Sequence, residues 1–216
     1  MSLLRDTAWR LKYTPDDGDL VRLFYVPALR SATRYDRLTG YFSSRALALA
    51  ARGIEGLVLN NGKMRLIVGC TLGEEDVEAI ERGEALRDAV ERTIQRMPPL
   101  TGDPRTVDAL ELVAWMVAQG YLDVKLAVPC DANRRPIRDD SIFHEKTGII
   151  EDKTGDRLAF NGSINETEYG WTRNWESFNA FTSWNDGPRV DEEEASFAKL
   201  WANQAKRAIT LDVPTA

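Results

Sequence analysis

Short apolar segments of strand length recur along this chain, separated by turns or by segments with helical patterning. The segment 63–70, for example, follows an Asn-Asn-Gly turn and is largely apolar, which is typical of a buried strand. Strands that alternate with helices pack as layers around one core, so this order predicts an α/β sandwich around a mixed sheet. We expect strands at 35–42, 63–70, 122–128, 143–150, 156–163 and 176–182.

The intervening segments carry the start and stop signals of helices. Pro27 suits the first turn of a helix, and Ser43 and Ser44 resemble caps in front of the alanine- and leucine-rich segment 45–59. The later helices are expected at 74–96, at about 107–118 with Val107, Leu110, Ala114 and Val117 on one face and Gly120 as cap, and at about 190–208 with Phe197, Leu200, Trp201 and Ala208 on one stripe.

Length and charge narrow the class of protein. A chain of 216 residues suits a single domain, residues 1–216. Its formal charge of −6 argues against a broadly basic protein that coats nucleic acid, but it allows a locally basic cleft. No segment approaches the roughly 20 apolar residues of a membrane-spanning helix, and the N-terminus lacks the apolar core of a secretion signal. We therefore expect a cytoplasmic protein without a membrane partner, in which Cys70 and Cys130 are buried thiols.

Polar side chains recur with a spacing of two residues on two neighbouring strands. His144 and Lys146 lie on the expected strand 143–150, where residues two apart share a face. Ser163 ends the next expected strand, and Asn165 lies just beyond it. If the two strands form a hairpin, these four side chains can converge on one point. Lysine, serine and asparagine stabilise the charge on phosphate oxygens, and histidine can attack phosphorus. Glu176 further along could orient a histidine.

These residues resemble the active-site motif of the phospholipase D superfamily. HEK at 144–146, GSIN at 162–165 and NWE at 174–176 are similar to its HxK…GSxN…E signature. The family has an aspartate five positions after the lysine, where this chain has Glu151. The resemblance implies the family's α/β/α sandwich and a nucleophilic role for His144. It implies that Lys146 and Asn165 bind phosphate, that Ser163 supports them through hydrogen bonds, and that Glu176 orients a histidine.

The family's chemistry uses two histidines, whereas this chain contains one. One histidine attacks phosphorus and the other protonates the leaving group. Each chain would then supply one half-site, and a homodimer with two-fold symmetry would bring two His144 residues together. A second motif on a missing C-terminal part of a longer chain is the alternative. The resemblance implies no metal and no cofactor, because lysines and histidines supply the electrostatic stabilisation.

A second resemblance concerns the N-terminal half. The segment PALRSATRYDRLTGYFSSRAL, followed by MRLIVGCTL, is similar to the phospholipase-D-like domain at the N-terminus of some bacterial superfamily II helicases, including helicases linked to phage defence. No Walker A motif occurs in the 216 residues, so a fused or associated helicase would lie beyond them. The chain is then expected to be the N-terminal fragment of a longer helicase.

Further side chains are candidates for substrate contacts. Arg134, Arg135 and Arg138 could hold backbone phosphates, or they could form a solvated basic loop. Trp171, Arg173 and Trp175 could stack on bases, or the segment could pack against the core.

The sequence thus predicts a metal-independent phosphodiesterase, most readily an endonuclease that cleaves DNA through a phosphohistidine on His144. One alternative is a catalytically silent module that dimerises and binds DNA for a helicase. The other is a phospholipase or phosphatidyl transferase, against which the lack of an amphipathic membrane helix argues.

Overall fold

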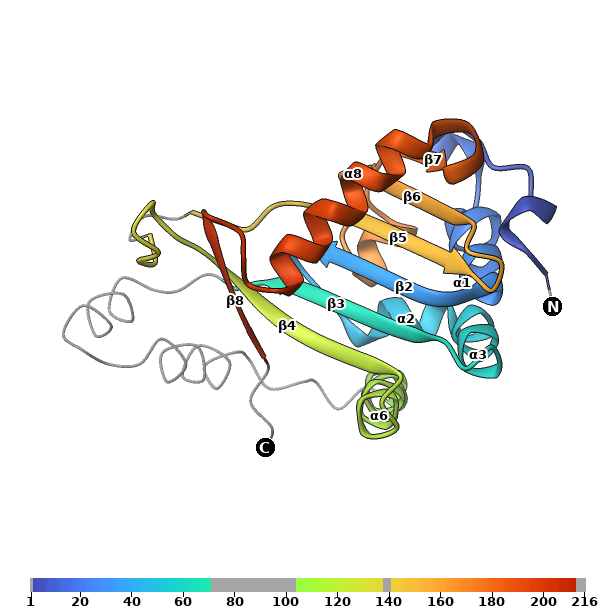
Figure 1. Ribbon diagram of the computed structural model, residues 1–216. Coiled ribbons are helices and arrows are strands. Elements are labelled where there is room, and N and C mark those ends of the chain that lie inside the picture. The colour runs from blue at the N-terminus through green and yellow to red at the C-terminus, as the bar shows by residue number, and fades with distance from the viewer. Residues whose placement is uncertain (1, 71–103, 138–140, 213–216) are drawn as a thin grey trace.

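The computed structural model describes residues 2–70, 104–137 and 141–212. These residues form one eight-stranded sheet in the order β1-β7-β6-β5-β2-β3-β4-β8 (Figure 1). The neighbours β2, β3 and β4 run parallel, and the other pairs are antiparallel. The mixed sheet predicted from the alternating pattern is confirmed. Its strands are β1 Lys12–Tyr13, β2 Ala32–Thr39, β3 Lys63–Gly69, β4 Leu122–Pro129, β5 Thr147–Asp152, β6 Arg157–Gly162, β7 Phe178–Thr182 and β8 Ala208–Asp212.

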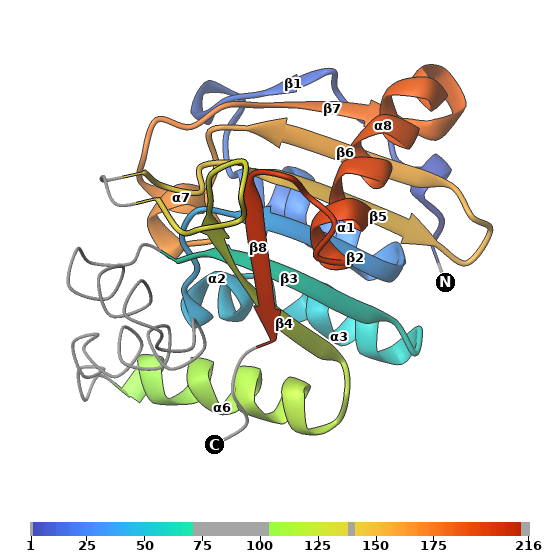
Figure 2. The same ribbon diagram turned by 60° about the vertical axis from the view of Figure 1, so that its left-hand side comes forward.

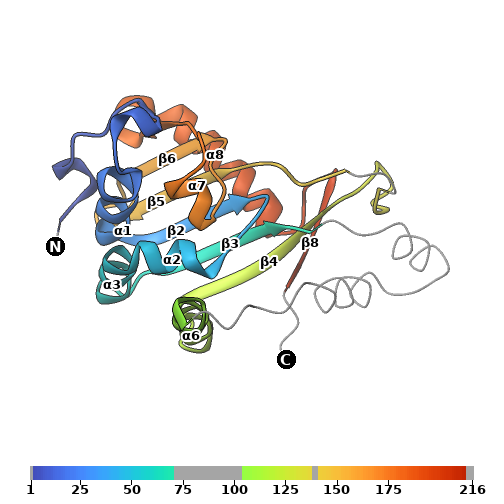
Figure 3. The same ribbon diagram turned by 180° about the vertical axis from the view of Figure 1, so that it is seen from behind.

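Helices cover both faces of the sheet, as Figure 2 shows. The long helix α8, Ser183–Trp201, lies on one face. The opposite face, seen from the front in Figure 3, carries the shorter helices. These are η1 Leu4–Asp6, η2 Pro15–Asp17, the π-helical turn η3 Val21–Tyr25, α1 Val26–Ser31, α2 Ser44–Leu49, α3 Ala51–Leu59, α6 Pro104–Ala118 and α7 Glu168–Thr172.

The sheet separates two hydrophobic cores, one on each face, and successive residues of the central strands point alternately into one and the other. Leu66 and Ile150 face the side of the shorter helices, whereas their neighbours Ile67 and Ile149 face α8. All four are fully buried, as expected for strands covered on both faces. The α/β/α sandwich is therefore confirmed. In the described ranges, no helix is both long and apolar enough to cross a membrane, and Cys70 and Cys130 are buried and unbridged, as predicted.

Several of the predicted boundaries are wrong. The strand expected at 35–42 runs instead from Ala32 to Thr39. The strand expected at 143–150 begins only at Thr147. The helix expected at about 190–208 instead ends at Trp201, and Ala208 opens the edge strand β8, which the sequence analysis missed. The physical cause is Asn203, whose φ of 56° is left-handed and stops a helix in the manner of a C-cap.

The buried face of α6 also differs from the prediction. Ala114 and Val117 are exposed, whereas Met116 is fully buried and Leu112 and Val113 pack on the same core. The helix has apolar residues around most of its circumference, so its spacing alone did not select the face. The side chains of Val107 and Leu110 and the helix expected at 74–96 lie outside the described residues.

Candidate active site

The candidate site lies at one end of the central strands, where β2 and β3 end and β5 begins. The predicted β5–β6 hairpin is confirmed, with Thr147 opposite Asn161. His144 and Lys146 precede β5 in an extended connection, and the Lys146 Nζ donates a hydrogen bond of 2.9 Å to the carbonyl oxygen of His144. Lys146 is 4 % exposed, whereas His144 is exposed. The expectation that both side chains share one face of a strand is therefore wrong.

The His144 ring makes no hydrogen bond with any residue in the described ranges. Its main chain is held in place, because the Lys146 ammonium contacts its carbonyl group. The ring is thus presented to solvent from a fixed backbone, as an attacking group needs to be.

Asn165 lies close to Lys146 and has a defined orientation. Its Oδ1 accepts a hydrogen bond of 3.2 Å from the Tyr41 backbone N–H and one of 3.3 Å from the Thr39 hydroxyl. Because the backbone N–H can only donate, the amide oxygen must point at Tyr41. The NH2 group of Asn165 is then the part left to donate to a ligand.

Gly40, which the sequence analysis did not single out, lies at the centre of this arrangement. A methyl group on Gly40 would lie 3.0 Å from the Phe143 carbonyl oxygen, 3.4 Å from the Asn165 Oδ1 and 3.7 Å from the Lys146 Nζ. Gly69 at the end of β3 is as crowded, since a methyl group there would lie 2.9 Å from the same Phe143 oxygen. The missing side chains let the connection 143–146 pass directly over the strand ends.

Ser163 and Glu176 lie on two segments that are pinned together. The Ser163 Oγ accepts a hydrogen bond of 3.1 Å from the Ser177 N–H, and the Ser163 N–H donates to the Ser177 carbonyl oxygen at 2.9 Å. Ser163 thus fixes the segment that carries Glu176. The half-buried Glu176 accepts a hydrogen bond of 3.1 Å from the Asn174 amide, and within the described chain it makes none with His144. Its role in orienting a histidine stays a prediction.

The protonation of Lys146 is set by opposing effects. Burial lowers the pKa of Lys146, the nearby Glu176 carboxylate raises it, and the Arg37 guanidinium lowers it further. The overall shift is downward, so Lys146 releases its proton more easily than an exposed lysine.

A buried ion pair lies beneath the site and was missed by the sequence analysis. Arg37 on β2 and Glu166 are both fully buried, and the Arg37 Nε donates a hydrogen bond of 2.8 Å to the Glu166 carboxylate. The hydroxyls of Tyr25 and Tyr35 donate to the same carboxylate. The available signals were the charged residues within β2 and the glutamate directly after the GSIN segment.

This cluster holds the main chain on both sides of Asn165. The Arg37 Nη2 donates to the Ile164 carbonyl oxygen at 2.5 Å, and the Glu166 N–H donates to the Thr39 Oγ1 at 2.9 Å. The segment that carries Asn165 is therefore fixed by buried side chains of β2.

The structure contradicts two of the candidate substrate contacts, and for Trp171 it confirms the alternative of packing against the core. Arg134 donates through Nη1 to the Ala205 carbonyl oxygen and through Nη2 to the Asn203 side chain, each at 2.5 Å, so it stabilises the loop after α8 instead of a phosphate. Trp171 is 3 % exposed and stacks on Tyr25, with ring centroids 4.2 Å apart, so its ring cannot reach a base. Arg135 and Arg173 are exposed, and Arg138 lies outside the described residues.

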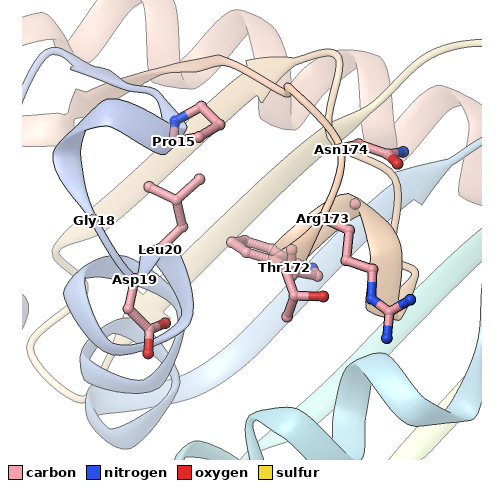
Figure 4. A pocket seen from close by; sticks show the side chains of 9 residues that line it. Pro15, Gly18, Asp19, Leu20, Thr172, Arg173 and Asn174 are labelled. Carbon is pink, nitrogen blue, oxygen red and sulfur yellow. The ribbon is translucent and has the colours of Figure 1, made fainter.

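Arg173 lines a pocket of about 340 Å³ between α7 and the segment 15–20, shown in Figure 4. Its guanidinium group lies 4.8 Å from the centre of the Tyr169 ring. The exposed Trp175 does not line this pocket, and neither do His144, Lys146 and Asn165. The pocket is therefore separate from the candidate site.

No protein-family model matches the sequence, and no curated protein matches it either. Solved structures do match the fold. NucT from Helicobacter pylori superimposes with a TM-score of 0.55 and 14% identity, over 93% of this chain and 97% of its own. Nuc from Salmonella typhimurium, a phospholipase D family member, superimposes with a TM-score of 0.50 and 13% identity, over 94% of this chain and 97% of its own. The chain therefore has a phospholipase-D-like fold.

Proposed function

We propose that this chain is a phosphodiesterase that cleaves nucleic acid, most readily DNA, through a covalent phosphohistidine on His144. The observation that carries the proposal is that the buried Lys146 ammonium and the oriented Asn165 amide lie together at the strand ends, and that the same ammonium holds the main chain of the exposed His144. The phospholipase-D-like fold supports it.

The proposed roles draw on the surroundings of Lys146, Asn165 and Ser163 and, for Glu176, on the motif resemblance. The Lys146 ammonium and the Asn165 NH2 group bind the non-bridging oxygens of the scissile phosphate and stabilise the charge that gathers there in the transition state. Ser163 and Glu176 support the site, Ser163 through its hydrogen bonds to Ser177 and Glu176 by accepting a ring N–H of a histidine.

The reaction proceeds in two displacements. A ring nitrogen of His144 forms a bond to phosphorus while the bond from phosphorus to the leaving oxygen breaks, and the leaving oxygen takes a proton from a second histidine. That second histidine then removes a proton from water, whose oxygen attacks phosphorus and releases His144. Protein side chains supply the positive charge and both proton transfers, so this mechanism needs no metal.

The second histidine is assigned to another copy of the chain. The 216 residues contain one histidine, so the proposal places the second one on a two-fold related copy, with the two exposed His144 rings facing one another. A second motif further along a longer chain is the alternative. Each chain then supplies one half-site. The helicase association rests on the N-terminal sequence resemblance and stays a prediction about segments outside these residues.

Wild-type protein should cleave DNA in the presence of EDTA, because the proposed chemistry uses only protein side chains. The assay compares single- and double-stranded DNA, RNA, and vesicles that contain phosphatidylcholine, all at equal phosphodiester concentration. Cleavage of DNA without hydrolysis of lipid is the expected result. DNA binding without turnover would instead indicate a silent DNA-binding module, and hydrolysis of lipid alone a phospholipase.

Mixing wild-type protein with His144→Ala protein should reduce activity if the site is shared. At a 1:1 ratio, about one quarter of the dimers retain both histidines, so cleavage per wild-type chain should fall to about half. Co-purification of differently tagged copies establishes that subunits have exchanged. If exchange occurs and activity per wild-type chain stays constant, the shared site is wrong.

A further inference from the structure

A pocket of about 460 Å³ opens directly beside His144. Its walls are the connection 142–145 on one side and the end of α8 with the loop to β8 on the other. Phe143, Leu200 and Ala208 are among the apolar residues that line it, and Ile142, which is 46 % exposed, lies at its edge. The volume lies within the range of about 300–1,000 Å³ typical of ligand sites.

The charged side chains that line the pocket are mostly cationic, whereas the chain as a whole has a negative net charge. Its lining contains three cations, Lys199, Lys206 and Arg207, and one carboxylate, Glu145, although the formal charge of the chain is −6. All three cations are exposed, and none forms an ion pair with another residue in the described part of the chain. Cations gathered in this way beside an apolar surface attract an anionic ligand that also carries an apolar group.

We propose that this pocket binds the strand of nucleic acid whose phosphodiester His144 attacks. A nucleoside next to the scissile phosphate lies against Phe143 and Ile142, and the adjoining phosphates contact Lys199, Lys206 and Arg207. The inference rests on the function proposed above, and it adds a specific path for the substrate. His144 itself lines the pocket, so a group bound there lies beside the scissile bond.

Charge favours this occupant over a second copy of the chain. If a second copy filled the pocket itself, the three cations would meet the same three cations, and like charges in contact oppose association. In the dimer proposed above, the two copies meet at the His144 rings, at one end of the pocket, and the cationic part of each pocket stays open to the strand. A nucleotide strand combines the two features that the pocket offers, since its phosphates pair with the cations and its base can stack on Phe143.

The test uses Lys199→Glu/Lys206→Glu and a matched control, Lys12→Glu/Lys153→Glu, which makes the same change in net charge. Lys12 lies on the distant edge strand β1, and Lys153 lies on the β5–β6 turn at the other end of the hairpin. Binding of a fluorescein-labelled single-stranded oligonucleotide is measured in a His144→Ala background. The pocket variant should bind about tenfold more weakly, with a slope of log affinity against log salt shallower by about one to two. The control should bind like the parent protein.

Catalysis is measured with the same oligonucleotide and with bis(p-nitrophenyl) phosphate, a diester too small to extend along the pocket. In the pocket variant, the ratio of kcat/KM for the oligonucleotide to that for the small diester should fall about tenfold. An unchanged ratio together with unchanged binding would overturn the pocket assignment and leave the proposed function standing. Failure of the wild-type protein to cleave either substrate would instead refute the proposed function.

Two further outcomes would also overturn the assignment. Loss of binding to anionic phosphatidylglycerol vesicles, with oligonucleotide binding unchanged, would assign the pocket to a lipid. A change in the dimer dissociation constant, again with oligonucleotide binding unchanged, would make it an interface between copies.

Discussion

Glu166→Leu is expected to lower the free energy of unfolding by about 3–5 kcal/mol. The substitution leaves the fully buried guanidinium of Arg37 without its carboxylate partner. It also removes the acceptor for the hydroxyls of Tyr25 and Tyr35. Buried donors and charges that lose their partners account for most of such losses.

The double variant Arg37→Met/Glu166→Leu distinguishes the cost of an unpaired buried charge from the cost of altered packing. Both charges are then removed together, so we expect much of the lost stability to return. Asp19→Asn is a control, because it breaks the exposed pair of Asp19 with Arg22 and should cost less than about 1 kcal/mol. Urea-induced unfolding measures the free energy of unfolding of Glu166→Leu, of the double variant and of the control, provided that all three show the same dependence on urea concentration. A cost below about 1 kcal/mol for Glu166→Leu would contradict this account of the pair.

The restored double variant should still be less active than wild type. Arg37 contacts the Ile164 carbonyl oxygen, so its loss frees the main chain next to Asn165 even when the fold is stable. We therefore interpret Arg37 as a positioning residue for the phosphate-binding amide, in addition to its part in stability.

Much of the architecture could be predicted from the sequence, because apolar periodicity reports directly on burial. The order of strands and helices predicted the sandwich, and the hairpin considered for the segments 143–150 and 156–163 is confirmed as β5–β6. The pattern could not place the start of β5, since residues 143–146 are held by the ends of β2 and β3, which are distant in sequence. The edge strand β8 was missed for a similar reason, because it pairs only with β4.

In the candidate site, too, some features follow from residue spacing along the chain and others from contacts between residues distant in sequence. Spacing along the chain drew attention to His144, Lys146, Ser163 and Asn165, but contacts between distant residues decide what each side chain can do. The need for a glycine at position 40 could be recognised only from the structure, because it depends on β2 ending beside Lys146. Exposure could not be read from the sequence, so base stacking and packing against the core both stayed open for Trp171, and the structure confirms the packing. Arg134, a candidate for phosphate contacts, instead holds the loop after α8.

His144→Ala is expected to lower the rate of phosphodiester cleavage by at least about a thousandfold. No other histidine in the chain could take over the attack. The side chain is exposed and makes no hydrogen bond within the described ranges, so the free energy of unfolding should change by no more than about 0.5 kcal/mol. The two measurements together distinguish loss of chemistry from loss of fold. Cleavage that persists at the wild-type rate would show that another group, or another protein, performs it.

The central claim is that His144 carries the phosphoryl group, and a trapping experiment tests it most directly. A radiolabelled nucleotide p-nitrophenyl ester is chosen because its leaving group departs easily, which makes release of the histidine the slow step. The protein is denatured in alkali during the first turnover, since phosphohistidine is stable in base and labile in acid, and the labelled peptide is identified by mass spectrometry. We predict a burst of p-nitrophenol matched by label on His144 and absent from His144→Ala. A burst without label on the protein, or with label on another residue, would contradict the account.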